Sequence, residues 1–412
     1  MKYGLIGEHL THSFSKVIHE QIGDYVYEIK EIEPQNVDAF MKQKDFCAIN
    51  VTIPYKETVM PYLDYIDSSA LQIGAVNTVV NKNGKLYGYN TDYFGMKALI
   101  SKINLEIKDK KVLIIGTGGT SKTATAVTKD LGAKEIIYVS NIAVNGAHTY
   151  EEIYSSHTDI QVIFNTSPVG MYPKNEGMPI DIDKFPYLEG VLDVVYNPIR
   201  TNLVIKAQSK GLVSQGGLYM LGAQAVYAYE YFMDTQVDKT VCDTVYNTVL
   251  KQKDNIVLTG MPSSGKTTVG KILANLTGKT FVDTDDEIVK RINMDIPSYF
   301  EKFGESEFRK IESEIIKEFS VKNNQIIATG GGAILKDINV NYLKQNGNIY
   351  FLNRSLENLI PTNDRPLSSS IEALKKRYDE RYHIYTSTAD VIIDGNGTPN
   401  EVATLIYGEY NK

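Results

Sequence analysis

The 412-residue sequence predicts an α/β protein made of successive domains, each with strands and helices in alternation. Short apolar runs alternate with helical patterns along the chain. Two of these runs lead directly into glycine-rich loops of different kinds, at residues 116–123 (GTGGTSKT) and 260–267 (GMPSSGKT). A strand, a glycine loop and a helix in succession are typical of nucleotide sites at the edge of a parallel sheet. We therefore expect two nucleotide sites in two different domains.

Composition supports compact globular domains and excludes several classes of protein. Hydrophobic residues make up 42% and charged residues 23% of the chain, and the net charge is −7. The acidic balance gives no sign of a nucleic-acid partner. The two cysteines, Cys47 and Cys242, argue against a disulfide framework and fit a reducing compartment. Without a signal peptide or a long apolar span, we predict a cytoplasmic protein with no membrane partner; its oligomeric state is not indicated.

The region around the first glycine loop has the pattern of a βαβ unit. Residues 111–115 form an apolar strand pattern, the loop follows, and 121–131 have a helical pattern. A second strand is predicted at 135–139, with further strands at 162–165 and 191–195. This context makes residues 116–123 a dinucleotide-binding loop in a Rossmann-type domain.

Four regions follow from these patterns. We predict an α/β substrate domain at 1–95, the Rossmann-type domain at 96–219, C-terminal helices at 220–250, and a P-loop domain with a parallel sheet at 254–412. The boundary lies in the short, polar and charged segment 249–255, which is too short for a freely moving tether.

The second glycine loop has the full P-loop pattern, between a strand at 255–259 and an apolar helix. Glycines allow backbone N–H groups to face phosphates, Lys266 reaches the β- and γ-phosphates, and Thr267 offers a hydroxyl to Mg²⁺. The predicted ATP-binding residues are Gly260, Ser263, Ser264, Gly265, Lys266, Thr267 and Thr268.

Several separated motifs follow the P-loop in a specific order. They are 283–285 (DTD), 304–309 (GESEFR), 328–332 (ATGGG), 365–367 (RPL) and 381–385 (RYHIY). With the P-loop, they make the C-terminal part resemble shikimate kinase along its whole length.

That resemblance implies a role for each matching residue. Asp283 corresponds to the carboxylate near Mg²⁺ and the acceptor hydroxyl, Asp285 to the ligand of the ring hydroxyls, and Arg365 to the charge stabiliser at the transferred phosphoryl group. The remaining implied substrate ligands are Arg309 and Arg381, which clamp the carboxylate, and Gly331 and Gly332, which face the ring. The lid segment 357–364 departs from the family because it is short and lacks basic residues, which predicts weaker closure over ATP.

The N-terminal part carries its own ordered motifs. They are 12–15 (HSFS), 50–57 (NVTIPYKE), 74–78 (GAVNT), 89–92 (YNTD), 165–171 (NTSPVGM) and 217–224 (GLYMLGAQ). Together with the first glycine loop, they make residues 1–250 resemble shikimate dehydrogenase, which interconverts 3-dehydroshikimate and shikimate.

Here the resemblance implies that Lys56 and Asp92 are the catalytic pair. Reduction of a carbonyl by hydride needs a proton at the oxygen, and a lysine ammonium held by an aspartate can deliver it. The implied substrate ligands are Ser13, Ser15, Thr52, Asn77, Tyr196 and Gln224. The implied cofactor-binding residues are Gly116, Gly118, Gly119, Thr120, Ser121, Lys122, Asn141 and Met220.

The cofactor preference depends on the segment after the second strand of the Rossmann-type domain. NADP-dependent members of the family usually have an arginine where this chain has Ile142, but no acidic residue typical of NAD binding follows the strand either. Because Lys122 offers a cation for the 2′-phosphate, we predict NADP, with NAD as the alternative.

The two resemblances together predict a bifunctional enzyme, because the product of the first reaction is the acceptor of the second. The implied cofactors are NADP, ATP and Mg²⁺, and the partners are the small molecules 3-dehydroshikimate and shikimate. Three alternatives stay open. The first is a shikimate- or quinate-type dehydrogenase with a regulatory or degenerate ATP-binding domain. The second is a related cyclohexanol dehydrogenase joined to a kinase for another polyol. The third is a nucleic-acid-linked P-loop protein, which the acidic charge disfavours.

Overall fold

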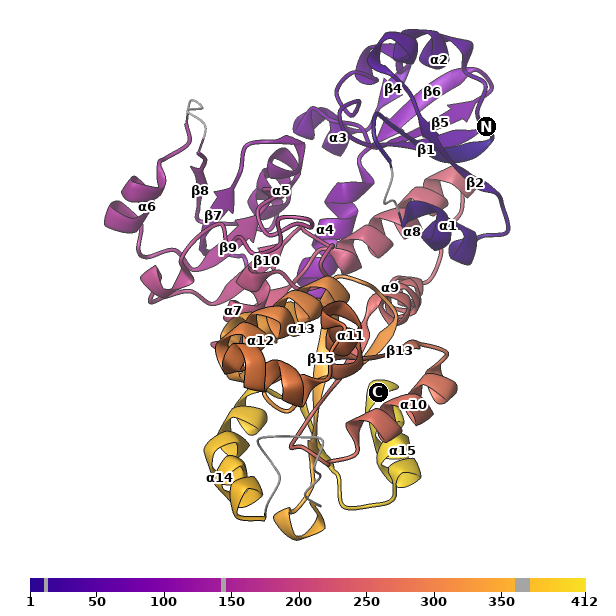
Figure 1. Cartoon of the computed structure of the whole chain (residues 1–412). Coiled ribbons are helices and arrows are strands. Elements are labelled where there is room, and N and C mark those ends of the chain that lie inside the picture. The colour runs from indigo at the N-terminus through magenta and orange to yellow at the C-terminus, as the bar shows by residue number, and fades with distance from the viewer. Residues whose placement is uncertain (11–13, 142–145, 360–370) are drawn as a thin grey trace. The chain divides into compact units, whose positions relative to one another are not determined.

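The structure is a computed structural model that describes residues 1–10, 14–141, 146–359 and 371–412. Its internal contacts divide the chain into two compact units, Met1–Leu250 and Lys251–Lys412. The first unit contains two sheets and the second contains one (Figure 1).

The first sheet is mixed and has the strand order β2-β1-β3-β5-β6-β4. Its strands are β1 (Tyr3–Gly7), β2 (Tyr27–Glu31), β3 (Ala48–Val51), β4 (Tyr65–Ile66), β5 (Thr78–Lys82) and β6 (Lys85–Tyr89). The helices of this region are α1 (Ser15–Ile22), α2 (Val37–Gln43) and α3 (Ser68–Ile73). Strands β1, β2 and β3 are parallel, and β5 and β6 form an antiparallel hairpin that brings β5 beside β3.

The second sheet is parallel and has the order β11-β10-β9-β7-β8. Its strands are β7 (Lys111–Ile115), β8 (Glu135–Val139), β9 (Val162–Asn165), β10 (Gly190–Asp193) and β11 (Val213–Gln215). The helices are α4 (Thr91–Lys102), α5 (Gly119–Asp130), α6 (Tyr150–Ser156), α7 (Asn202–Ser209), α8 (Leu218–Met233) and α9 (Thr240–Lys253). The strand order reverses between β7 and β9, and in open parallel sheets a ligand binds at the carboxyl ends of such a pair.

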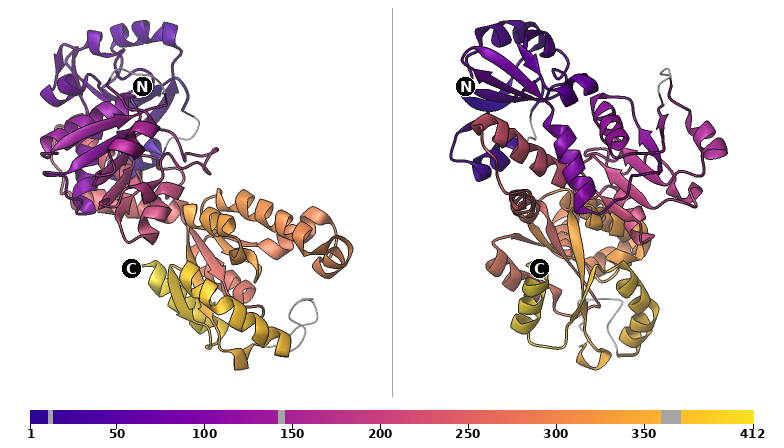
Figure 2. Two further views of the ribbon diagram at one scale, coloured as in Figure 1. Left: turned by 90° about the vertical axis from the view of Figure 1, so that its left-hand side faces the viewer. Right: turned by 180° about the vertical axis from the view of Figure 1, so that it is seen from behind.

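The third sheet is also parallel, with the order β13-β14-β12-β15-β16. Its strands are β12 (Asn255–Thr259), β13 (Thr280–Asp283), β14 (Gln325–Ala328), β15 (Gly347–Asn353) and β16 (Val391–Asp394). The helices are α10 (Lys266–Thr277), α11 (Thr284–Ile292), α12 (Ile296–Ser320), α13 (Asp337–Asn346), α14 (Ile371–Thr388) and α15 (Pro399–Tyr410). Within this unit, helices α10 and α15 cover one face and α12 and α13 the other (Figure 2).

Short 3₁₀ turns complete the element list: η1 (Pro34–Asn36), η2 (Met60–Tyr62), η3 (Ile182–Lys184), η4 (Ala333–Leu335) and η5 (Leu356–Asn358).

Continuous apolar runs form the central strands because both faces of each parallel sheet are covered. In β7, Val112 and Ile114 pack in one core, and Leu113 and Ile115 pack in the core of the opposite face. Successive side chains of a strand point to opposite faces, so a strand buried on both sides needs an apolar residue at every position. This confirms the α/β class predicted from the alternating runs.

The helical pattern predicted from 220 to 250 is divided into two helices. Helix α8 ends at Met233, and Asp234 follows in the left-handed conformation with φ of +49°. Asp is among the residues that accept this conformation most readily. Helix α9 then continues to Lys253, so the polar segment chosen as the domain boundary is mostly helical.

Candidate active sites

The first glycine loop lies at the carboxyl end of β7 and leads into α5. Gly116 has φ of +101°, and a Cβ there would lie 3.1 Å from Oγ1 of Thr166 in the loop after β9. A Cβ at Gly118 or Gly119 would meet nothing within 4 Å. The start of α5 is therefore uncrowded beside these glycines, which leaves room for the pyrophosphate of a dinucleotide.

Lys56 and Asp92 form a close ion pair in the first unit. The Lys56 Nζ lies 2.5 Å from Oδ2 of Asp92, and the two side chains are 22% and 17% exposed. Asp92 lies in the first turn of α4, which Asn90 caps by accepting a hydrogen bond from the amide of Tyr93. The Lys56 backbone is held by Val76, whose amide donates to the Lys56 carbonyl over 2.8 Å. The turn after β3 thus positions Lys56, and helix α4 positions Asp92. Both side chains remain partly exposed to solvent.

The buried side-chain amide of Asn77 is hydrogen-bonded to Thr91, the residue before Asp92. Oδ1 of Asn77 accepts hydrogen bonds from the backbone amide of Thr91 over 2.7 Å and from the hydroxyls of Thr78 and Thr91. This fixes the orientation of the side-chain amide, so that its nitrogen is the group left to donate to a ligand. The hydroxyl of Thr91 also lies 3.4 Å from Oε1 of Gln224, which joins α4 to α8.

Close helix packing explains why Gln224 lies here. Helices α4 and α8 approach at Gly95, where a Cβ would lie 2.8 Å from the carbonyl oxygen of Met220 and 3.0 Å from the Cβ of Gln224. A larger residue would separate the helices. Met220 and Gln224, both predicted ligands, are buried on α8 at this contact.

The other predicted residues of this unit have varied surroundings. Ser15 is buried at the start of α1, and Thr52 is half-buried directly after β3. Tyr196 packs edge-to-face against Phe14, and its burial raises the pKa of its hydroxyl. Among the cofactor residues, Ser121 is buried, Thr120 is half-buried and Asn141 is exposed. Ser13 and Ile142 lie outside the described residues.

Lys122, the predicted partner of a 2′-phosphate, is paired with Glu57. Their side chains meet at 2.6 Å and are 45% and 59% exposed. A cavity of about 540 Å³ lies beside α5, with Lys122, Lys129, Ser121 and Thr125 in its wall. Two ammonium groups and two hydroxyls suit a phosphorylated ligand, which would compete with Glu57 for Lys122.

In the second unit, the P-loop lies at the carboxyl end of β12. Gly260, Ser263 and Gly265 have positive φ angles of +152°, +65° and +92°. The Lys266 Nζ lies 2.9 Å from the carbonyl oxygens of Gly260 and Met261 and 3.4 Å from Oγ of Ser264. The lysine is therefore folded against its own loop and is 6% exposed. Thr268 continues the first turn of α10.

Thr267 and Asp283 bring two oxygen ligands together. The Thr267 hydroxyl donates to Oδ2 of Asp283 over 2.7 Å, and Oδ1 of Asp283 accepts the amide hydrogen of Asp285 over 3.0 Å. Mg²⁺ prefers such hard oxygen ligands and is commonly held by one or two protein groups together with phosphates and water. In the part of the chain that the structure describes, no group of three or more His, Cys, Asp or Glu could hold a metal ion. The Thr267–Asp283 pair fits a Mg²⁺ ion that arrives with a nucleotide.

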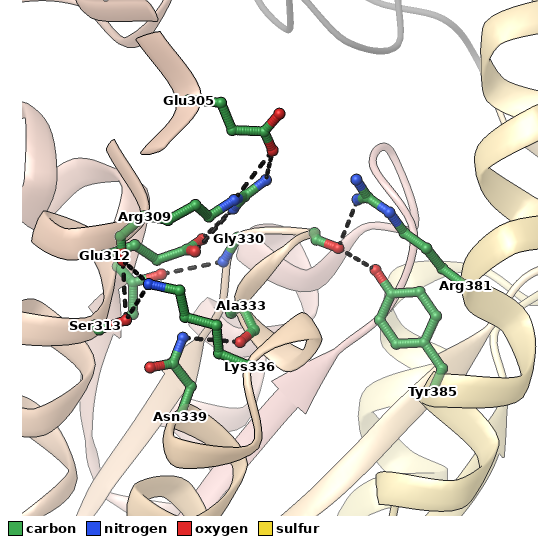
Figure 3. A network of polar contacts seen from close by, with 12 residues as sticks. Glu305, Arg309, Glu312, Ser313, Gly330, Ala333, Lys336, Asn339, Arg381 and Tyr385 are labelled. Atoms are coloured by element: carbon green, nitrogen blue, oxygen red, sulfur yellow. Dashed lines mark hydrogen bonds and ion pairs between the residues drawn. The ribbon is translucent and has the colours of Figure 1, made fainter. Parts of the chain in front are cut away.

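The predicted carboxylate clamp is assembled by acidic partners and glycines (Figure 3). Arg309 on α12 donates from Nη1 to both carboxylate oxygens of Glu312, over 2.9 and 2.8 Å. Burial raises the pKa of Glu312, against the lowering effect of Arg309. At Gly332, a Cβ would lie 2.4 Å from the Arg309 guanidinium, so a larger residue would displace the guanidinium from this position.

Arg381 on α14 is buried against the glycine segment. Its Nη1 donates to the carbonyl of Gly331 over 3.0 Å, and the Tyr385 hydroxyl lies 2.5 Å from the same oxygen and 3.0 Å from the carbonyl oxygen of Gly260. Asp285 borders this region too, because a Cβ at Gly330 would lie 2.6 Å from its Oδ1. The P-loop, the glycine segment and the clamp therefore belong to one site.

Sequence reasoning overlooked Glu312, Tyr385 and Arg377, although each lies one helical turn from a predicted residue. Glu312 follows Arg309 by three positions, and Tyr385 and Arg377 lie four positions on either side of Arg381. Helical neighbours at these spacings share a face, which is the signal that would have found them. Burial and the nearby Arg381 lower the pKa of Arg377. Arg365 and lid residues 360–364 lie outside the described residues.

Comparison with known proteins agrees with both halves of this description. Residues 5–79 match the family model of the shikimate dehydrogenase substrate binding domain. The chain is 36% identical over 262 residues to the shikimate dehydrogenase (NADP(+)) of Clostridium beijerinckii, covering 60% of this chain and 96% of the relative. The chain belongs to the shikimate dehydrogenase family. Residues 262–410 match the family model of shikimate kinase, so the dehydrogenase part is followed by a shikimate kinase domain.

Solved structures show the same relationship. Shikimate dehydrogenase 1 from Peptoclostridium difficile is 34% identical with a TM-score of 0.55, and the match covers 60% of this chain and 98% of that one. A chorismate mutase/shikimate 5-dehydrogenase fusion protein from Clostridium acetobutylicum is 33% identical with a TM-score of 0.57, covering 60% and 96%. The predicted family resemblances and fold class are confirmed. Among the described residues, no helix has the length and apolar character needed to cross a bilayer.

Proposed function

We propose that the chain catalyses two consecutive reactions of aromatic amino acid biosynthesis. The dehydrogenase unit reduces 3-dehydroshikimate to shikimate with NADPH, and the kinase unit transfers the γ-phosphoryl group of ATP to the 3-hydroxyl of shikimate. The observation that carries the proposal is that each unit brings together chemical groups suited to its reaction: Lys56 with Asp92, and Lys266, Thr267 and Asp283 with Arg309 and Arg381.

In the first reaction, Lys56 acts as the general acid. The bound nicotinamide supplies the hydride that adds to the carbonyl carbon. The Lys56 ammonium donates a proton to the carbonyl oxygen as charge develops there, and the Asp92 carboxylate holds the ammonium in place. Because both side chains are partly exposed, water can return the proton to Lys56. Asn77, whose amide oxygen is already engaged, donates to a substrate oxygen.

In the second reaction, the residues of the kinase unit position the acceptor and neutralise charge. Arg309 and Arg381 hold the substrate carboxylate, and Asp285 accepts hydrogen bonds from ring hydroxyls. Asp283 is proposed to orient the attacking hydroxyl and accept its proton. Thr267 and Asp283 would hold a Mg²⁺ ion, which would neutralise phosphate charge, and Lys266 adds a further positive charge. Arg365 is proposed to stabilise the transferred group.

NADP is the proposed nicotinamide cofactor. The curated relatives with which the dehydrogenase part aligns are named for NADP(+), and Lys122 lies in the wall of a cavity with a second lysine, which supports a phosphorylated ribose as the ligand. Steady-state kcat/KM with NADPH and NADH separates the two choices. A higher value with NADH would overturn the assignment.

One assay tests both activities of the full chain. Purified protein receives 3-dehydroshikimate, NADPH and Mg·ATP, and the oxidation of NADPH and the release of ADP are followed together. The proposal requires ADP release that depends on 3-dehydroshikimate and NADPH, with shikimate 3-phosphate as the product. NADPH oxidation without ADP release, even when shikimate is added directly, would instead indicate a dehydrogenase with a non-catalytic ATP-binding domain.

A further inference from the structure

The Arg309 guanidinium is engaged by two carboxylates of its own helix, one on each side (Figure 3). Glu312 accepts from Nη1 with both oxygens. Glu305 uses a single oxygen, Oε1, which lies 3.2 Å from Nε and 3.0 Å from Nη2. The edge formed by Nε and Nη2 is one that a planar carboxylate binds with two parallel hydrogen bonds.

The two carboxylates differ in how firmly they are held. The Glu312 side chain is 1% exposed, whereas that of Glu305 is 51% exposed. Glu305 also follows Gly304 directly, at the point where α12 is interrupted by a glycine with φ of +81° and ψ of 167°. Exposed ion pairs between helical neighbours are weak and exchange readily with water. Glu312 is therefore a fixed partner of Arg309, and Glu305 is an exchangeable one.

The Glu305 carboxylate also lies within a group of cations. Arg377 interacts electrostatically with Arg381 and Arg309 and with the carboxylates of Glu305 and Glu380. Arg381 reaches the same region from α14 and donates to Gly331. Two of these arginines, Arg309 and Arg381, are the proposed clamp for the carboxylate of the substrate. The Glu305 carboxylate thus lies at the Nε and Nη2 edge of Arg309, where a ligand carboxylate would also bind.

We propose that Glu305 is an internal competitor for the ligand carboxylate and thereby determines the specificity of the kinase site. This inference rests on the proposed kinase function. A ligand carboxylate displaces Glu305 from the Nε and Nη2 edge of Arg309, and the freed Glu305 side chain turns to water. Glu312 keeps the guanidinium in place throughout.

This competition selects for charged ligands. A ligand with a full negative charge gains the interaction with Arg309 and Arg381 and can replace Glu305. A neutral ester or amide of the same ring cannot, because a neutral oxygen binds a guanidinium more weakly than the carboxylate already there. Specificity here comes from an unfavourable exchange for the wrong ligand as well as from contacts with the right one.

The test is the substitution Glu305→Gln in the full chain, with initial rates of ADP release measured against shikimate without nicotinamide cofactor. Gln keeps the size and helical setting of Glu but removes the competing charge. We expect the KM for shikimate to fall by about threefold to tenfold, the effect of removing one like charge near a partly exposed site. The matched control is Glu307→Gln, two positions away, where Glu307 pairs with Lys310 over 2.6 Å on the exposed surface. The control KM should stay within a factor of two.

Calorimetric binding of shikimate and of methyl shikimate to the same variants completes the test. The dehydrogenase site contributes equally to each variant, so differences report on the kinase site. Tighter binding of shikimate, but not of the ester, in Glu305→Gln supports the inference. An unchanged or higher KM in Glu305→Gln, or the same decrease in Glu307→Gln, overturns it while leaving the kinase function intact. If neither the parent chain nor Glu305→Gln bound or phosphorylated shikimate, the proposed substrate would be wrong, and this inference would fail with it.

Discussion

The two glycine loops of this chain use lysine in opposite ways. In the kinase unit, Lys266 is buried and contacts two carbonyl oxygens of its own loop. In the dehydrogenase unit, Lys122 is half exposed and pairs with Glu57, the neighbour of Lys56. A P-loop encloses the terminal phosphates and needs a charge inside the loop, whereas a dinucleotide loop offers backbone amides and leaves its charge at the rim. We therefore expect a substitution of Lys266 to affect catalysis and one of Lys122 to affect binding.

The largest effect is expected at the proposed catalytic pair of the dehydrogenase, Lys56 and Asp92. Lys56→Ala removes the proton donor for the carbonyl oxygen, and kcat for 3-dehydroshikimate reduction should fall by about 10²- to 10⁴-fold. Kinase activity on added shikimate in the same preparation should be unchanged. A loss of less than tenfold would show that another group or water supplies the proton.

The corresponding substitution in the P-loop should have the next largest effect. Lys266→Ala removes a preorganised charge at the phosphates, and kcat for ADP release should fall by about 10²- to 10³-fold. NADPH-dependent reduction serves as the internal control and should not change. Equal rates in the variant and the parent chain would contradict the assignment of this loop to phosphoryl transfer.

Substitution of the exposed lysine sharpens the comparison. Lys122→Gln should raise the KM for NADPH about fivefold with little change in kcat, because a partly exposed ion pair contributes about 1 kcal/mol. The KM for NADH, which lacks the 2′-phosphate, should remain the same. An equal increase for both cofactors would mean that Lys122 acts through the loop or through Glu57 and not on the phosphate.

A separate effect, on folding stability and not on turnover, concerns the buried carboxylates of the two units. Glu312 is paired with Arg309, whereas Asp193, at the end of β10, accepts hydrogen bonds from the neutral groups of Thr201, Asn165 and the amide of Val195. Burial raises the pKa of Asp193 to about 6, from an ordinary value of 3.8. The folded state thus binds this proton more tightly than the unfolded state does.

The raised pKa of Asp193 makes the free energy of unfolding depend on pH. Stability from this group is greatest below about pH 4 and decreases as the pH rises to about 6, by about 3 kcal/mol for a shift of about two pKa units. In Asp193→Asn, this contribution should disappear, so the difference in free energy of unfolding between variant and parent should change over that interval. Urea unfolding between pH 4 and 8, with dehydrogenase activity marking the unit, measures it. A constant difference would contradict the raised pKa.

Much of the fold was accessible from sequence because it depends on local patterns. The strands predicted at 111–115, 135–139 and 255–259 have those bounds in the structure, since a run buried on both faces must be apolar throughout. The break after α8 was missed, because a helix can end at Asp234 without Gly or Pro. The structure brings described candidate residues together at one site in each unit. Their roles remain predictions.

What the sequence by itself determined is the type of each nucleotide loop, the α/β class and the families of both parts, since these depend on local patterns and on short motifs in a fixed order along the chain. Only the tertiary structure decided which charges meet. Lys253, in the polar segment expected at a boundary, is buried, and its burial lowers its pKa to about 8. The partners of Lys122 and Arg381 likewise come from distant segments. The physical reason is that burial and ion pairing are properties of neighbours in space, which local patterning does not encode.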